Sequence, residues 1–333
     1  MKAFIINRYS KKDKLLLAEM PMPILKSHEV LVEIHAASVN QLDCKLKNGD
    51  FKLMLPYKFP LILGHDVAGV VVKTGPKVTK FKVGDEVYAR PADFHIGTFA
   101  EYIAIHEKDA ALKPKNISME QAASLPLVAL TVWQALIEKV KLKKEQKVFI
   151  QAGSGGVGSI AIQLAKYLDA YVATTTSTNN IKMVQKLGAD LVIDYKNDDF
   201  ETILKDYDVV LNSQDEKSLI KSMQILKSGG KIVSISGPPD MNYAKENNLS
   251  FFMKTAIYFL SRKVRKIAHK LNIHYSFLFM EANGKQLSEI TKLVEDGKIH
   301  PVIDKVFPFD ETNDAMSYVE SGRAKGKVVI KVK

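Results

Sequence analysis

The stretch Val148-Phe-Ile-Gln-Ala-Gly153-Ser-Gly155-Gly156-Val-Gly158 decides the fold that we expect for this chain. It begins as a short apolar strand and runs directly into a glycine-rich turn, and the apolar residues Ile160, Ile162 and Leu164 then mark a helix. A strand, a glycine-rich turn and a helix in this order are typical of a site that holds a dinucleotide pyrophosphate. The alternative is a tight connection without a ligand, but the strands and helices that follow favour the binding site.

Each glycine of this turn has its own expected task. Gly153 permits the tight turn, Gly155 lets the backbone approach the pyrophosphate without a Cβ, and Gly158 lets the helix pack closely on its strand. Backbone N–H groups at the start of the helix complete the anion site, so the remaining candidate cofactor residues here are Ser154, Gly156 and Val157.

Apolar runs alternate with helical patterns over the middle of the chain. Buried strands separated by helices predict a parallel sheet covered on both faces, as in a doubly wound nucleotide-binding domain. The predicted strands are Val148–Ile150, Tyr171–Ala173, Asp190–Ile193, Asp208–Leu211 and Lys231–Ile235, and the predicted helices are Gly156–Leu168, Ile181–Leu187 and Glu216–Leu226.

The first third of the chain has a different pattern. Short β-rich runs are separated there by glycine turns, which predicts a β-rich lobe. The predicted strands are Glu29–His35, Val67–Thr74, Glu86–Ala89 and Tyr102–Ile105.

Composition limits the class of protein. With 333 residues and 46% hydrophobic content, about two globular domains are expected. One cysteine, Cys44, excludes an internal disulfide and a structural zinc site of several cysteines. No signal peptide or long apolar run is visible, so we expect a cytoplasmic protein without a membrane partner. The net charge of +11 is spread along the chain, which makes nucleic-acid binding an unfavoured role.

The residues after the second strand of the sheet bear on the choice of cofactor. An NAD site carries an acidic residue about twenty positions after the glycine turn, whereas the stretch Thr174–Asn180 has hydroxyls and amides only. Thr176, Ser177 and Lys182 can bind a 2′-phosphate, which favours NADPH over NADH. The alternative is a polar loop in which Ser177 or Thr178 caps the next helix.

The segment Phe251–Leu271 has apolar residues at helical spacing and basic residues between them, which predicts one amphipathic basic helix. A helix packed on the core is the favoured interpretation. Lining of the substrate pocket and contact with a membrane or a partner remain open.

Several further motifs follow one another along nearly the whole chain. They are Ala37-Ser-Val-Asn40-Gln-Leu-Asp43, Gly64-His65-Asp66-Val-Ala-Gly69, Val83-Gly84-Asp85-Glu-Val87, Ala122-Ala-Ser-Leu-Pro126, Leu130-Thr131-Val-Trp133, Leu187-Gly-Ala-Asp190 and Glu320-Ser-Gly322-Arg-Ala-Lys-Gly326-Lys327. In this order they resemble the motifs of the medium-chain dehydrogenase/reductase superfamily. Within it, the chain resembles the zinc-independent quinone oxidoreductase branch, which includes zeta-crystallin-like, NADP-dependent enzymes.

This resemblance implies a Rossmann doubly wound parallel sheet plus a split, β-rich, GroES-like catalytic domain. The expected domains are residues 1–124 and 282–333 for the catalytic part and 125–281 for the NADP-binding part. The resemblance also adds Thr131, Tyr195 and Lys327 to the candidate cofactor residues. It implies a homodimer formed through an edge strand at His274–Met280.

The resemblance also addresses the catalytic metal of zinc-dependent relatives. Asn40 stands at the position of their first cysteine ligand, His65 remains, and the third position falls near Leu127, which has no donor. Because catalytic zinc needs three protein ligands, we expect no zinc. Cys44 and His95 also have donor atoms, but Cys44 does not match a ligand position, and we expect it to be a buried or half-buried thiol.

The candidate catalytic residues are Asn40, His65 and Asp43. We expect hydride transfer from NADPH to a quinone or α,β-unsaturated carbonyl, with Asn40, His65 or water stabilising the developing oxyanion. Purely structural roles remain open, with Asn40 as a turn residue and His65 held by Asp43. The alternative functions are an enoyl-thioester reductase, although no tyrosine stands between Asn40 and Tyr57, a zinc-type alcohol dehydrogenase, and an NADPH-binding structural or RNA-binding protein.

Overall fold

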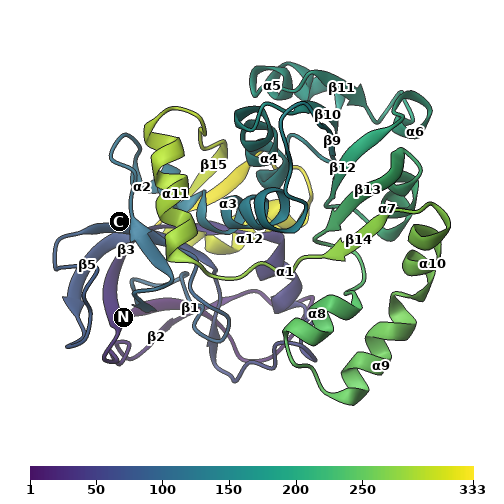
Figure 1. Cartoon of the computed structure of the whole chain (residues 1–333). Coiled ribbons are helices and arrows are strands. Elements are labelled where there is room, and N and C mark those ends of the chain that lie inside the picture. Colours follow the sequence, from purple (N-terminus) through teal and green to yellow (C-terminus); the bar gives the residue numbers. More distant parts are fainter. The chain divides into compact units, whose positions relative to one another are not determined.

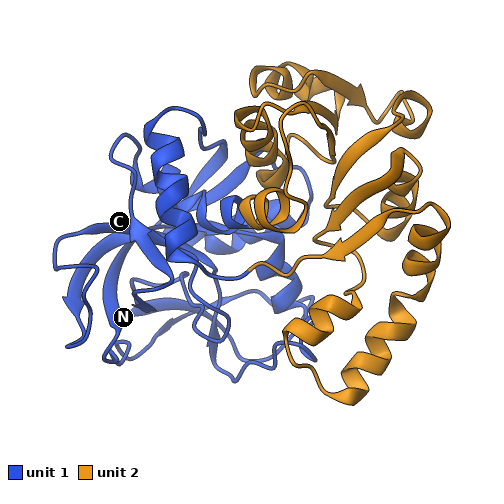
Figure 2. Ribbon diagram, in the orientation of Figure 1, with its two compact units in different colours: residues 1–130, 281–333 blue, residues 131–280 orange.

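The computed structural model describes all residues from 1 to 333 and divides them into two compact units. Unit 1 consists of residues 1–130 and 281–333, and unit 2 of residues 131–280 (Figure 2). The sequence predicts domain boundaries after residues 124 and 281. In the structure the two units meet after Leu130 and after Met280 along the chain.

Unit 2 is built on a six-stranded sheet in which every neighbouring pair is parallel. Its strands are β9 (Lys147–Ile150), β10 (Tyr171–Thr176), β11 (Leu191–Asp194), β12 (Tyr207–Asn212), β13 (Leu226–Ser234) and β14 (His274–Phe277) (Figure 1). The strand order is β11-β10-β9-β12-β13-β14, so the chain leaves β9 toward one edge and later returns to its other side. This is the Rossmann strand order, and it confirms the predicted fold class for this unit.

The helices of unit 2 connect these strands. They are η1 (Gln134–Lys139), a π-helical turn, α4 (Gly156–Tyr167), η2 (Thr178–Asn180), α5 (Ile181–Lys186), α6 (Phe200–Ile203), α7 (Glu216–Met223), α8 (Met241–Glu246), α9 (Phe251–Leu260) and α10 (Arg262–Lys270). The predicted single helix over Phe251–Leu271 is therefore wrong, because Ser261 ends α9 and separates it from α10.

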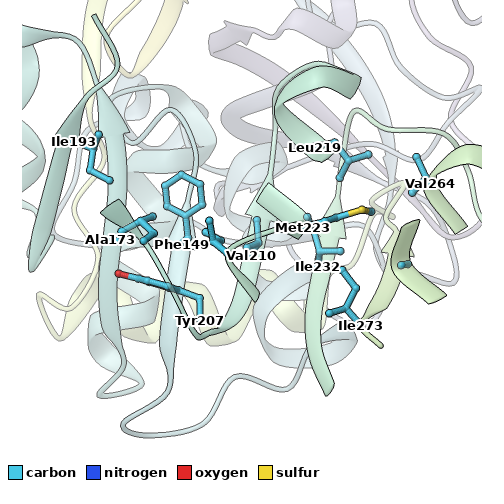
Figure 3. Close-up of a cluster of buried hydrophobic side chains, with 13 residues drawn as sticks. Phe149, Ala173, Ile193, Tyr207, Val210, Leu219, Met223, Ile232, Val264 and Ile273 are labelled. Atoms are coloured by element: carbon cyan, nitrogen blue, oxygen red, sulfur yellow. The ribbon is translucent and has the colours of Figure 1, made fainter. Parts of the chain in front are cut away.

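A buried apolar cluster holds one face of this sheet to its helices (Figure 3). Phe149 and Ile232 point from the sheet into the cluster, where Leu219 and Met223 of α7 and Val264 of α10 meet them. All five side chains are almost completely buried. Burial of a large apolar side chain contributes about 1.5–3 kcal/mol, so this cluster fixes α7 and α10 on the sheet.

Unit 1 is rich in β-structure, as predicted. Its strands are β1 (Lys2–Ile6), β2 (Leu16–Glu19), β3 (Glu29–Val39), β4 (Leu61–Ile62), β5 (Asp66–Thr74), β6 (Glu86–Ala89), β7 (Tyr102–His106), β8 (Ala110–Leu112), β15 (Ile303–Pro308) and β16 (Lys327–Lys331). A three-stranded sheet has the order β2-β1-β4, and a seven-stranded sheet has the order β15-β16-β3-β5-β6-β8 with β7 paired to β3. Because β3 pairs antiparallel with β16, residues from both ends of the sequence build one sheet.

The helices of unit 1 lie around these sheets. They are α1 (Gln41–Lys47), α2 (Met119–Ala123), α3 (Pro126–Trp133), which runs across the boundary of the units, α11 (Gly284–Glu295), η3 (Phe309–Glu311) and α12 (Thr312–Glu320). None of the helices in the chain is both long enough and apolar enough to span a lipid bilayer.

Candidate functional site

The glycine turn lies where the sequence predicts it, between the end of β9 and the start of α4. Gly155 is the residue before α4 and has an extended backbone, and no side chain caps this helix. The first N–H groups of a helix have no partner within it, and the helix dipole makes this end positive. The turn can therefore bind a pyrophosphate.

The three glycines of the motif differ in the space around them. A Cβ at Gly153 would lie 2.2 Å from Oγ1 of Thr174, and one at Gly158 would lie 2.3 Å from the carbonyl oxygen of Ala152. A Cβ at Gly155 would meet that same oxygen at 3.3 Å and no other atom within 4 Å. Gly153 and Gly158 are therefore required by packing within the protein, whereas the space beside Gly155 is open to a ligand.

A cluster of hydroxyl and amide groups lies next to this turn. Oγ1 of Thr176 donates a hydrogen bond to Oγ of Ser154 at 2.9 Å. Nδ2 of Asn180 donates to Oγ of Ser154 at 3.3 Å and to Oγ of Ser177 at 3.1 Å. We call Ser154, Thr176, Ser177 and Asn180 the hydroxyl cluster. The side chain of Ser177 caps no helix, so the capping alternative is wrong for this residue.

Two further predicted cofactor residues lie near this cluster along the backbone. The N–H of Tyr195 donates to the carbonyl oxygen of Thr176 at 3.1 Å, and the ring of Tyr195 is 61% exposed. Lys182 is exposed on the first turn of α5. Their side chains are free to contact a nucleotide. Thr131 is buried in α3.

The carboxylate of Asp194 lies beside Thr176 and Thr178. Asp194 is not among the predicted site residues. It ends β11, which pairs in parallel register with β10 so that Asp194 lies opposite Thr176. Its carboxylate accepts hydrogen bonds from Oγ1 of Thr178 at 2.5 Å, from Nδ2 of Asn197 at 2.9 Å and from the N–H of Lys196 at 3.1 Å. These donors, Thr178 first, hold the pKa of Asp194 below its ordinary value. The stretch Thr174–Asn180 itself contains no carboxylate, but Asp194 brings one to Thr178 from the neighbouring strand.

Unit 1 contains a buried polar network centred on Asp66, which belongs to the Gly64-His65-Asp66 motif but is not among the predicted site residues. Oδ2 of Asp66 accepts hydrogen bonds from Oγ of Ser38 at 2.8 Å, from Nδ2 of Asn40 at 2.9 Å and from Nζ of Lys327 at 3.0 Å. Oδ1 accepts the N–H of Leu127 at 2.7 Å. These side chains are 0–6% exposed, or 9% at Leu127. These donors offset the cost of burying the carboxylate of Asp66, and the ammonium of Lys327 pairs with it at 3.0 Å.

In this network the ammonium of Lys327 donates two strong hydrogen bonds and one weak one, and the amide nitrogen of Asn40 donates one strong and one weak. Nζ of Lys327 donates to Oδ1 of Asn40 in a short hydrogen bond, and it lies 3.5 Å from the carbonyl oxygen of Val39. Nδ2 of Asn40 lies 3.4 Å from the carbonyl oxygen of Ser38. Contacts of 3.4–3.5 Å are weak, so each group retains a hydrogen that it can donate elsewhere.

Asp43 connects the two predicted catalytic residues Asn40 and His65. Its Oδ1 lies 2.6 Å from Nδ1 of His65, and its Oδ2 accepts the N–H of Asn40 at 2.8 Å. His65 and Asp43 are completely buried, and Nε2 of His65 has no hydrogen-bond partner. The contact with Asp43 orients the imidazole ring and holds a proton on Nδ1.

Comparison with known proteins identifies the family. The family described as an alcohol dehydrogenase GroES-like domain matches residues 26–115, and the family described as a zinc-binding dehydrogenase matches residues 187–330. The human protein named NAD(P)H oxidoreductase RTN4IP1, mitochondrial, is 36% identical, and the match covers 100% of this chain and 89% of that protein. The chain belongs to the medium-chain dehydrogenase/reductase superfamily.

Two other relatives place the chain within this superfamily. The 2-methylene-furan-3-one reductase of Solanum lycopersicum is 37% identical over 99% of this chain and 79% of that protein. The solved structure of the quinone oxidoreductase from Coxiella burnetii superposes with a TM-score of 0.87 at 30% identity, and the match covers 100% of this chain and 99% of that chain. The chain is an NAD(P)H-dependent oxidoreductase of the quinone and alkenal reductase branch.

The donor set of this superfamily member does not fit a catalytic zinc ion. Three positions hold zinc in zinc-dependent relatives, and His65, Asn40 and Leu127 occupy them here. His65 has one free ring nitrogen, whereas the amide of Asn40 is bonded to Asp66 and Lys327. Leu127 has no donor atom in its side chain. No group of three His, Cys, Asp or Glu side chains in the structure is arranged to hold a metal ion.

The predicted site residues form two sets, each within one unit. In unit 2 the glycine turn, Ser154, Thr176 and Ser177 lie together, and the backbone of Tyr195 joins them. In unit 1 Asn40, Asp43 and His65 lie together, and Lys327, which the sequence assigned to the cofactor, belongs to their network. Its role toward the cofactor stays a prediction.

Cys44 provides a direct test of the packing of α1. Its thiol is buried, and Sγ donates a weak hydrogen bond to the carbonyl oxygen of Met316 at 3.9 Å. Burial raises the pKa of this thiol well above its ordinary range. Because only the thiolate reacts rapidly, we expect the folded protein to resist a disulfide reagent at neutral pH and to react with one equivalent after unfolding in urea. Rapid reaction of the folded protein would show that α1 opens or is packed differently.

Proposed function

We propose that this chain is a zinc-independent, NADPH-dependent reductase of quinones or α,β-unsaturated carbonyl compounds. The observation that carries the proposal is a pair of buried donors, both bonded to Asp66: the amide of Asn40, which stands at a zinc-ligand position of zinc-dependent relatives, and the ammonium of Lys327 next to it. They supply positive potential where zinc-dependent relatives use a metal ion.

The cofactor is assigned to unit 2 in this proposal. Backbone N–H groups from Gly156 to Gly158 at the start of α4 would hold the pyrophosphate, since no side chain caps this helix. The hydroxyl cluster and Lys182 would hold the 2′-phosphate, and the exposed ring of Tyr195 would lie against the adenine nucleotide. Bound NADPH supplies a hydride to an acceptor that tolerates added electron density.

The residues of unit 1 would bind and polarise the acceptor. The weakly bonded hydrogens on Nδ2 of Asn40 and Nζ of Lys327 can be donated to the carbonyl oxygen of a substrate. As negative charge develops on that oxygen, these donors stabilise it, and Asp66 prevents the ammonium from turning away. A conjugated acceptor needs no stabilisation beyond these donors, because the negative charge that develops on it during hydride transfer is spread over several atoms. Nε2 of His65 is the second candidate group, because it has no partner in the network.

Turnover with a panel of acceptors tests this proposal. The purified protein is mixed with NADPH and with quinones, enones, an enoyl thioester or a simple aliphatic aldehyde, and the loss of the absorbance of reduced nicotinamide is followed. We expect turnover with quinones or enones and none with the aliphatic aldehyde. Elemental analysis of the same sample is expected to find no stoichiometric zinc. Activity only with the thioester, or loss of activity on zinc chelation, would contradict the proposal.

The preference for NADPH can be tested at Lys182. A hydrogen bond to a charged group contributes about 1.5–3 kcal/mol, so Lys182→Ala should weaken NADPH binding by about tenfold or more and leave NADH binding unchanged. Lys186→Ala is the matched control, because Lys186 is equally exposed one turn later on α5. Dissociation constants from titrations of both nucleotides give the comparison. Equal weakening of NADH and NADPH, or tighter binding of NADH than NADPH by the unsubstituted protein, would exclude this assignment.

We also propose a homodimer that forms through β14. This strand is the edge of the sheet in unit 2 and pairs only with β13 within the chain. Its outer N–H and C=O groups can therefore pair with a second copy. Light scattering of the purified protein is expected to give twice the chain mass of 37.2 kDa. The cytoplasmic location stays a prediction, because the human relative is named mitochondrial.

A further inference from the structure

Helix α9 presents large apolar side chains to solvent. Phe251 is 79% exposed, Phe252 85%, Phe259 64% and Leu260 66%, whereas Ile257 is the only residue of this helix that is buried. Phe252 and Phe259 are seven residues apart, so they lie on one side of the helix two turns apart. Figure 1 shows α9 next to α8 and α10 of the same unit. The favoured interpretation that the apolar residues of Phe251–Leu271 pack on the core is therefore wrong for α9.

The residues that follow are strongly basic. The segment from Phe251 to Lys270, which we call the α9–α10 segment, contains six lysines and arginines and no acidic residue: Lys254, Arg262, Lys263, Arg265, Lys266 and Lys270. Lys263 forms an ion pair with Glu216 at 2.9 Å, and the guanidinium of Arg265 lies over the ring of Tyr258 at 4.2 Å. Arg262, Lys266 and Lys270 are exposed and form no ion pair.

The exposure of α9 does not result from a frayed end, because both ends of this helix are held. Oγ of Ser250 accepts the N–H of Met253 at its start. At its end Oγ of Ser261 donates to the carbonyl oxygen of Ile257 at 2.7 Å, and Nε of Arg265 donates to Oγ of Ser261 at 3.1 Å. Val264 then anchors α10 in the core of unit 2. The apolar surface and the cations are thus fixed in neighbouring helices.

The charge of the segment decides which partner it fits. A second copy placed with its own α9–α10 segment on this surface would bring six further cations and no carboxylate, so the two surfaces would repel each other. A membrane surface with anionic lipids offers negative headgroups for the cations and an apolar layer for phenylalanine and leucine side chains. Exposed Phe and Leu beside Lys and Arg are the composition of helices that lie in a membrane interface.

We propose that the α9–α10 segment binds the protein to the surface of membranes that contain anionic lipids. The side chains of Phe251, Phe252, Phe259 and Leu260 insert between the headgroups, and Arg262, Lys266 and Lys270 bind lipid phosphates. The proposal does not depend on the catalytic assignment, and it revises the sequence expectation that the protein has no membrane partner.

Flotation with vesicles tests the proposal on the full-length protein. Vesicles of phosphatidylcholine alone are compared with vesicles of equal parts phosphatidylcholine and phosphatidylglycerol, at low and at high salt. We expect the protein to float with the phosphatidylglycerol vesicles at low salt and to be released at high salt. No binding, or equal binding to both kinds of vesicle, would overturn the proposal.

Two variants separate the apolar and the charged contributions. The apolar variant carries Phe252→Ser and Phe259→Ser, and its partition constant for the vesicles should be lower by at least about tenfold. The charge variant carries Arg262→Gln, Lys266→Gln and Lys270→Gln, and its partition constant should be lower on the order of a hundredfold. The control for the apolar variant carries Ile24→Ser and Leu53→Ser, since these two side chains are 89% and 83% exposed. The control for the charge variant carries Lys11→Gln, Lys12→Gln and Lys14→Gln at three exposed lysines. The controls should bind vesicles as the unsubstituted protein does.

Parallel measurements on the same variants test whether α9 contacts a second copy of the chain, the substrate or RNA instead of a membrane. Thermal stability, NADPH affinity and turnover should not change in either variant. A change from dimer to monomer in the Phe252→Ser, Phe259→Ser variant would make α9 a contact between copies, and an altered KM would place it at the substrate; either result would overturn the proposal. Binding of the unsubstituted protein to single-stranded RNA without binding to vesicles would overturn it as well.

Discussion

Replacement of Asp66 by asparagine is expected to lower the free energy of unfolding by about 3–5 kcal/mol. Asp66 accepts four hydrogen bonds and carries the only negative charge in contact with the buried ammonium of Lys327. Asparagine keeps the shape of the side chain but leaves that ammonium without a counter-charge in a site where water cannot replace it. Urea unfolding followed by circular dichroism gives the change.

A double-mutant cycle shows whether this loss comes from the ion pair. Lys327→Met alone should also destabilise unit 1, but Asp66→Asn with Lys327→Met should lose less than the sum of the two single losses, because no unpaired charge remains. Asp50→Asn is the control, since Asp50 is exposed and should change stability by less than about 0.5 kcal/mol. Strict additivity of the two substitutions, or a loss at Asp66 no greater than the control, would contradict the assignment of a buried ion pair.

Alanine at Gly155 is expected to weaken NADPH binding by about a hundredfold without a matching loss of stability. A Cβ at this position meets only one protein atom, at 3.3 Å, so the fold can accept it. It would stand between the backbone N–H groups and the pyrophosphate, and loss of one hydrogen bond to a charged phosphate costs about 1.5–3 kcal/mol. Titration calorimetry gives the dissociation constant, and the melting temperature gives the stability.

Gly158→Ala is the opposite case and serves as the comparison. The new Cβ would overlap the carbonyl oxygen of Ala152 at 2.3 Å, so this substitution should destabilise unit 2 by about 1–3 kcal/mol. NADH should be weakened by Gly155→Ala as strongly as NADPH, because both nucleotides contain the pyrophosphate. Unchanged affinity of the Gly155→Ala variant would mean that the nucleotide binds elsewhere.

The sequence predicts unit 2 well because its strands are buried on both faces and appear as continuous apolar runs. Val148–Ile150 and the glycine turn after it lie within one residue of their predicted places. The failures have a common cause, which is that periodicity does not show what packs on each face. Leu260 has the spacing of a core residue, yet the chain bends at Ser261 and leaves Leu260 in solvent.

The candidate site was predictable where its residues lie at the ends of adjacent strands of one sheet or match motifs of the family. Ser154 and the stretch Thr174–Asn180 follow adjacent strands, so the hydroxyl cluster could be expected. Asp194 comes from the next strand of the sheet, and only the parallel register of β10 and β11 places it beside Thr178. The network of Asp66 joins residues that are 261 positions apart in the sequence at Lys327, and no local pattern predicts such a contact.

The pairing of β16 with β3 has a consequence for the order in which the protein matures. Unit 2 is one continuous stretch, so it can fold on the ribosome while the rest of the chain is still being made. Unit 1 cannot complete its fold before β16 is synthesised, because Lys327 at the start of β16 is the counter-charge of Asp66. A nascent chain therefore holds a finished nucleotide-binding unit before its other half can close, and during that interval the free edge of β3 is the part that needs protection from aggregation.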